Sequence, residues 1–246
     1  MTPPLFHGPR LKIERAKEHI NDLHRRLKLF ETTNFYRLLI EYDPNTDKNI
    51  LKVTQTQPIP DDFALLIGDA IHNLKGALDF SVSDILLKVT GRRSKYAKFP
   101  VYSTRDNLVG AIKGGDVNQA PKEIIDFIVD VVKPYDGGNE AICALHEFNI
   151  LDKHMLLLPV VQFGVLTDFG LENDRGAEWT GLTFGLETGI VSLPQRGKLK
   201  VTNNGQASMF IYFDKGMPFE NKPIIPTLMQ FAELVGGIVE QFERLV

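Results

Sequence analysis

Apolar residues recur every three or four positions in several long stretches of the chain, and this spacing predicts helices. Between residues 10 and 31, Ile13 and Ile20 belong to one apolar stripe, and charged residues occupy most other positions. A second helix is predicted from about Asp61 to Val89, and a third from about Asn139 to Leu158. Apolar residues lie all round the third helix, so we expect it at the centre of a bundle.

The apolar spacing shortens to every second residue in two other regions, and this pattern is typical of strands. Residues 35–57 contain two such runs joined by the sequence DPNTDK, whose Asp, Pro and Asn favour a turn. From Phe163 to Phe213, short runs of this kind alternate with glycine-containing turns. We therefore predict an early β-hairpin and a later antiparallel sheet.

These elements predict an α+β fold, with a helical bundle, an N-terminal β-hairpin and a small antiparallel sheet in the C-terminal third. We expect one compact domain over residues 1–246. Its predicted parts are a mainly helical region at 1–161 that includes the hairpin, a β region at 162–221 and a closing helix at 222–246. The amphipathic helices near both ends also suit a homodimer.

Composition narrows the classes of function. The chain has 246 residues, with 28 basic and 31 acidic side chains, so it lacks the positive charge expected of a protein that mainly binds duplex DNA. The longest apolar run, Met155–Val161, is far shorter than the roughly 20 residues of a membrane helix. Cys143 is the only cysteine, so no disulfide forms within the chain and we expect a cytoplasmic protein.

Polar side chains interrupt the predicted third helix, although apolar residues surround them. On a helical wheel, His146, Asn149 and Lys153 share one face, and Glu147 and His154 share another. A buried polar group without a partner costs on the order of 1 to 3 kcal/mol. These side chains therefore need hydrogen-bond partners or a cavity that holds water.

The predicted second helix carries a matching polar face. His72, Gly76, Asp79 and Ser83 follow the spacing i, i+4, i+7 and i+11, which places them on one side of the helix. Packing of the two helices would bring His72 and Asp79 to one of the two polar faces of the third helix. The sequence leaves open which face it is, and whether the helices meet.

Three roles are open for such a cluster. In a structural network, Asp79 accepts hydrogen bonds from Lys153 or from a histidine. In an acid/base site, His154 and His72 transfer protons and Lys153 stabilises developing negative charge. In a metal site, His72, Asp79 and His154 are the ligands, but they lack the short spacing of common zinc motifs.

Two segments of the chain carry a resemblance. IGDAIHNLKGALDF (Ile67–Phe80) and LHEFNILDKHMLLLPV (Leu145–Val160) resemble segments of a group of uncharacterised bacterial proteins of similar length. The resemblance implies a site formed by His72, Asn73, Lys75, Asp79, Asn149, Asp152, Lys153 and His154. Lys75 and Met155 stand where that group has arginine, and the loss of two guanidinium groups weakens bidentate capture of phosphate.

The second segment is also similar to the helical HEPN ribonucleases, in which an arginine precedes a histidine by a short spacing. Here Asn149 takes the place of the arginine, and four residues separate it from His154. This similarity implies a metal-independent endoribonuclease, with His154 and His72 as acid and base and Lys153 as the electrophile.

The main hypothesis is a ligand-binding or interaction protein that uses no cofactor and no metal, and the ribonuclease is its alternative. The ligand is then a small molecule or RNA. The binding residues under this hypothesis are Asn73, Lys75, Asp79, Asn149 and Asp152.

Overall fold

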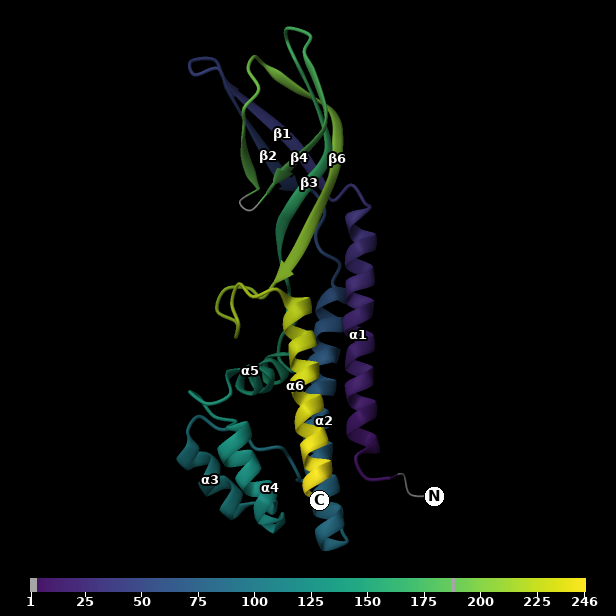
Figure 1. Ribbon diagram of the computed structural model, residues 1–246, viewed down its shortest axis with the longest axis vertical. Helices are drawn as coiled ribbons and strands as arrows, with labels where there is room; N and C mark the ends of the chain where they lie inside the picture. The colour runs from purple at the N-terminus through teal and green to yellow at the C-terminus, as the bar shows by residue number, and fades with distance from the viewer. Residues whose placement is uncertain (1–3, 187–188) are drawn as a thin grey trace.

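The computed structural model describes residues 4–186 and 189–246, which form an elongated molecule (Figure 1). The strands gather at one end, and the helices form a long body below them. This arrangement confirms the predicted α+β class, with its early hairpin and its later antiparallel sheet. Residues 1–3 and 187–188, which belong to the predicted domain and β region, lie outside the described residues.

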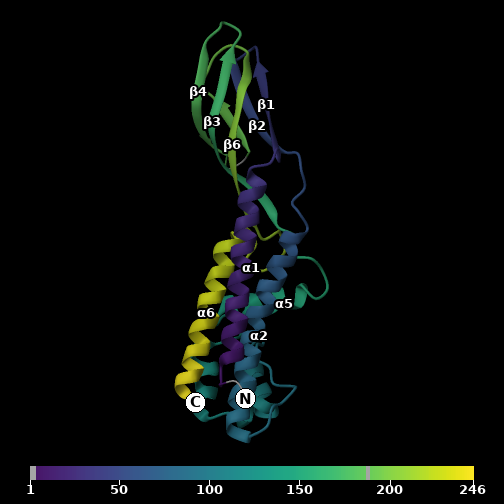
Figure 2. The same ribbon diagram turned by 90° about the vertical axis from the view of Figure 1, so that its right-hand side faces the viewer.

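Three long helices run side by side along the body: α1 (His7–Glu31), α2 (Asp62–Thr90) and α6 (Ile224–Leu245) (Figures 1 and 2). Ile13 and Ile20 of α1 are buried, as the apolar stripe predicted. Burial of these stripes is the main stabilising contribution to the bundle. Within the described residues, no helix combines the length and apolar character needed to cross a membrane.

Shorter helices lie against one flank of the body. They are α3 (Arg105–Gly114), the 3-10 turn η1 (Asp116–Gln119), α4 (Lys122–Asp126), the π-helical turn η2 (Phe127–Val132) and α5 (Glu140–Leu151). Figure 1 shows α5 beside α2 and α6, and it does not lie between them.

The predicted third helix was therefore wrong in its length and its position. α5 ends at Leu151, seven residues before the predicted end, and Met155 and Leu158 are exposed beyond it. After the helix the chain makes a tight turn, in which the His154 N–H donates to the Leu151 carbonyl at 2.9 Å. Residues 156–159 then belong to no helix or strand, and Leu157 alone turns into the core, where it is 1% exposed.

Two antiparallel sheets form the β head at the top of the molecule. One sheet has the order β1 (Tyr36–Asp43), β2 (Lys48–Gln55) and β5 (Ile190–Leu193). The other has the order β4 (Glu178–Gly185), β3 (Val160–Asn173) and β6 (Leu199–Tyr212). Apolar side chains of both sheets belong to the same continuous hydrophobic cluster as those of the helical body.

The β head is connected to the body at four points along the chain. β1 and β2 lie in sequence between α1 and α2, and β3 to β6 lie between α5 and α6. The head is therefore an insertion in two pieces, and its position depends on both helical connections.

Candidate functional site

The predicted polar faces of α2 and α5 meet in part, at His72 and Asn149, whereas Gly76 faces Lys12 of α1 and Asp79 bonds to Lys75 and Phe99. His72 Nδ1 of α2 lies 3.3 Å from Asn149 Oδ1 of α5. One turn earlier on α2, Gly68 leaves room for Asp152 at the end of α5, since a Cβ at Gly68 would lie 2.0 Å from Asp152 Oδ1. Burial and the charge of Asp69 raise the pKa of Asp152, and His72 works against this effect.

A second polar contact from α2 involves Lys75 and Asp79. Lys75 is only 4% exposed, and its Nζ lies 2.5 Å from Asp79 Oδ1. The same carboxylate oxygen accepts the Phe99 N–H at 2.8 Å, and Lys75 Nζ donates to the Phe99 carbonyl at 3.4 Å. Burial lowers the pKa of Lys75, although Asp79 raises it. The pair thus holds both backbone groups of Phe99 against α2.

Phe99 belongs to one wall of a pocket with a volume of about 420 Å³. The other walls come from the end of α3, from η1 and from α5, which contributes His146. The lining residues are Tyr96, Lys98, Phe99, Pro100, Val101, Tyr102, Ala111, Ile112, Gly115, Asp116, Val117 and His146. Lys75 and Asp79 therefore position a pocket wall, although neither side chain lines the pocket.

His146 is a polar side chain of this pocket with an unsatisfied hydrogen-bonding atom. Its Nδ1 is buried and has no hydrogen-bond partner within residues 4–186 and 189–246. Burial lowers the pKa of His146, the charges of Lys75, Lys153 and Lys98 lower it further, and Asp79 works against this effect. The environment therefore favours the neutral form of the imidazole over the charged form.

His146 is not among the site residues predicted from the sequence. The signal was present, because His146 shares one predicted face with Asn149 and Lys153. Its importance depends on residues 96–102 and on η1, which lie far from it in the sequence. No local pattern indicated that these segments approach α5.

Other predicted residues lie away from this pocket. Asn73 faces α1, where its Oδ1 accepts from Lys12 Nζ at 3.0 Å, and its Nδ2 donates to the Asp69 carbonyl at 2.7 Å. Lys153 and His154 are exposed in the turn after α5. In the described part of the chain, the His154 side chain has no hydrogen bond or ion pair, including any to His72.

His72, Asp79 and His154, the three possible metal ligands, do not form a group either. Asp79 is engaged by Lys75 and by the Phe99 N–H. The described residues contain no set of three metal-binding side chains close enough to hold one ion.

No family model matches the chain, and neither a curated protein nor a solved structure matches it at a significant level. The resemblances to the bacterial group and to the HEPN ribonucleases therefore stay predictions from the sequence.

Proposed function

We propose that this chain is a binding protein for a small anionic molecule, which it holds in the pocket beside His146. The observation that carries the proposal is the buried Nδ1 of His146 without a partner. An unsatisfied buried polar atom costs about 1 to 3 kcal/mol, and such a cost is common where a protein is shaped for a ligand. A bound molecule can supply the missing hydrogen bond after a small rotation of the imidazole.

The charges around the pocket favour an anion. Lys98 lines the pocket, and the charges of Lys75 and Lys153 also act on His146. On the acidic side, Asp79 is paired with Lys75, and Asp116 accepts a hydrogen bond from Ser94. The charges of Lys75 and Asp79 cancel, and Lys98 and Lys153 then stand against Asp116 alone, so a negative group gains Coulomb energy there.

Two tyrosines favour a ligand with a flat apolar body. Tyr96 is 73% exposed and Tyr102 is 42% exposed, and both line the pocket. Lys95 Nζ lies 5.0 Å from the centre of the Tyr96 ring, so that ring already carries a cation–π contact on one face. An aromatic or alicyclic acid would bury the remaining apolar ring surface.

Binding fits this site better than covalent catalysis. Lys75 has a lowered pKa, which is a property of nucleophilic lysines, but it is 4% exposed and held by Asp79. A substrate cannot reach its Nζ without breaking that ion pair. Lys75 thus acts as a positioning residue for the wall at Phe99.

Calorimetric titration of the full chain with benzoate and with inorganic phosphate tests this proposal. We expect benzoate to bind more tightly than phosphate, because only benzoate has a flat apolar body. Lys98→Gln should weaken benzoate binding about tenfold, which is ~1.4 kcal/mol. Lys215→Gln, at an exposed lysine in the loop after β6, is the matched control and should leave binding unchanged.

Side-chain NMR of the histidines gives a second measurement. We expect benzoate to shift the imidazole signals of His146 more than those of His154, which lies outside the pocket. Absence of binding by both probes, or equal affinity of Lys98→Gln and the wild type, would show that this pocket is not an anion site.

A further inference from the structure

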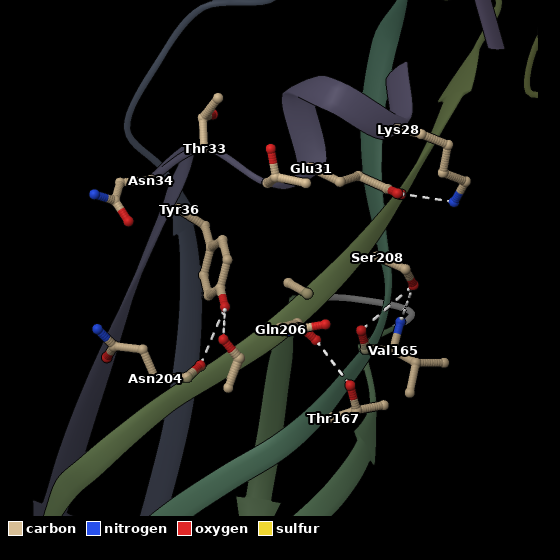
Figure 3. Close-up of a pocket in the computed structure, with 13 residues that line it drawn as sticks. Lys28, Glu31, Thr33, Asn34, Tyr36, Val165, Thr167, Asn204, Gln206 and Ser208 are labelled. Atoms are coloured by element: carbon tan, nitrogen blue, oxygen red, sulfur yellow. Dashed lines mark hydrogen bonds and ion pairs between the residues drawn. The ribbon is translucent and has the colours of Figure 1, made fainter. Parts of the chain in front are cut away.

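A separate groove lies where α1 ends against the β head, and Figure 3 shows its lining residues. Its volume is about 530 Å³. The end of α1 and residues 32–36 form one side, and β3 and residues 204–208 of β6 form the other. None of its lining residues belongs to the His146 pocket.

The floor of the groove is already fixed by hydrogen bonds. Glu31 Oε1 of α1 accepts the Met209 N–H of β6 at 2.9 Å. The Tyr36 hydroxyl donates to the backbone carbonyls of Asn204 and Gly205 at 3.1 and 2.9 Å (Figure 3). These side chains occupy backbone groups on the open edge of β6. An extended peptide therefore cannot add there as a further strand without displacing them.

Three carboxamide side chains at the groove are free to bind a ligand. The side chains of Asn34, Asn204 and Gln206 make no hydrogen bond to any described residue, whereas their backbone carbonyls do. Each carboxamide offers two donor hydrogens and one acceptor oxygen. In Figure 3 the Tyr36 ring stands between Asn34 and Asn204, so an apolar face lies among these groups.

The side chains that line the groove have almost no net charge. Its ionisable lining side chains besides Tyr36 are Lys28 and Glu31, whose Nζ and Oε2 atoms lie 2.8 Å apart. A charged ligand would lose hydration here without gaining an unpaired counter-charge. A ligand with many hydroxyl groups and no charge loses less and can use all three carboxamides.

We propose that this groove binds an uncharged carbohydrate, with one sugar ring against Tyr36 and its hydroxyls bonded to Asn34, Asn204 and Gln206. The site is independent of the anion pocket. Because the floor is held by Glu31 and Tyr36 before the ligand arrives, little ordering of the protein opposes binding.

The test is calorimetric titration of the full chain with two uncharged trisaccharides, maltotriose and chitotriose, and with the charged trisaccharide of galacturonic acid. We expect at least one uncharged trisaccharide to bind at least tenfold more tightly than the charged one. The double variant Asn204→Ala/Gln206→Ala should lose at least tenfold in affinity. Gln230→Ala on the exposed face of α6 is the matched control and should bind as the wild type does.

Thermal melts of the double variant should match the wild type, because neither carboxamide supports the fold. The proposal is overturned if neither uncharged trisaccharide binds at millimolar concentration, if the charged one binds as well, or if the double variant keeps full affinity. Tighter binding of an uncharged tetrapeptide than of either saccharide would assign the groove to peptides instead.

Discussion

The buried pair of Lys75 and Asp79 allows the sharpest test of the site, through the substitution Asp79→Ala. Asp79 Oδ1 accepts from both Lys75 Nζ and the Phe99 N–H. Its removal leaves a lysine that is 4% exposed and a backbone N–H without their partner. Loss of one member of a buried ion pair costs about 3 to 5 kcal/mol.

The lower end of this range applies to Asp79. Its side chain is 29% exposed, so water can enter part of the space that the substitution leaves. Burial also lowers the pKa of Lys75, so release of its proton relieves part of the cost of losing Asp79. We therefore expect Asp79→Ala to lower the free energy of unfolding by about 3 kcal/mol. For a chain of this size the midpoint temperature falls by about 6 to 12 °C.

The assay is urea unfolding at pH 7 followed by far-ultraviolet circular dichroism, with the double variant Lys75→Met/Asp79→Leu as control. The double variant has no buried charge, but the Phe99 N–H and the Phe99 carbonyl both lose their side-chain partner. It should be within about 1 to 2 kcal/mol of the wild type. The reasoning is refuted if Asp79→Ala changes stability by less than about 0.5 kcal/mol, or if the double variant loses as much stability as Asp79→Ala does.

The same pair predicts a dependence on pH. Because burial lowers the pKa of Lys75 below 10.5, the folded chain binds fewer protons than the unfolded chain between the lowered pKa and 10.5. The Lys75 contribution therefore makes stability rise with pH in this window. Urea titrations from pH 8 to 10 should show this rise relative to Lys75→Met, and parallel curves for the two proteins would contradict it.

Three further outcomes are expected from other parts of the chain. His146→Leu should raise the free energy of unfolding at pH 7 by about 1 kcal/mol, because it removes a buried nitrogen without a partner. Burial lowers the pKa of His146 below 6.5, so the folded chain binds fewer protons at this residue than the unfolded chain just below pH 6.5. The wild type therefore loses stability as the pH falls below 6.5. Thermal melts at pH 5 and 7.5 should show a smaller loss in His146→Leu. Gly237→Ala on α6, where a Cβ meets nothing within 4 Å, should stabilise the chain by about 1 kcal/mol. Gly68→Ala should destabilise it, because the new Cβ would clash with Asp152 at the end of α5. Calorimetric melts of the two variants compare these effects. His154 is exposed and forms no hydrogen bond with His72. We therefore expect the wild type to leave mixed RNA intact in the presence of chelator. Cleavage that His154→Ala abolishes without a change in melting temperature would support the ribonuclease alternative instead.

Local pattern was enough to predict much of the fold. Ile13 and Ile20 lie on the buried stripe of α1, and the DPNTDK turn joins β1 to β2 as expected. The polar faces of α2 and α5 meet at one predicted pair, His72 and Asn149, although Gly76 of the same predicted face lies toward α1. These features depend on periodicity and turn chemistry, which the sequence expresses directly.

Features that depend on distant segments could not be predicted. The sequence predicts a helix as far as Leu158, but the chain leaves α5 after Leu151 and enters β3 at Val160, and Leu157 alone of residues 153–158 is buried. The pocket at His146 has the same origin, since its walls come from residues 96–102, from 111–117 and from α5. The side chains that line the pocket come together through the topology of the fold, which periodicity along one sequence does not reveal.

The pairing of β2 with β5 has a consequence for synthesis on the ribosome. Lys52 pairs with Ile190, and these residues are about 140 positions apart in the chain. At translation rates of roughly 5 to 20 residues per second, the first hairpin waits on the order of 10 to 30 s for its third strand. During that time the β2 edge is open to other nascent chains, and the charge of Lys48 on that strand discourages such contacts.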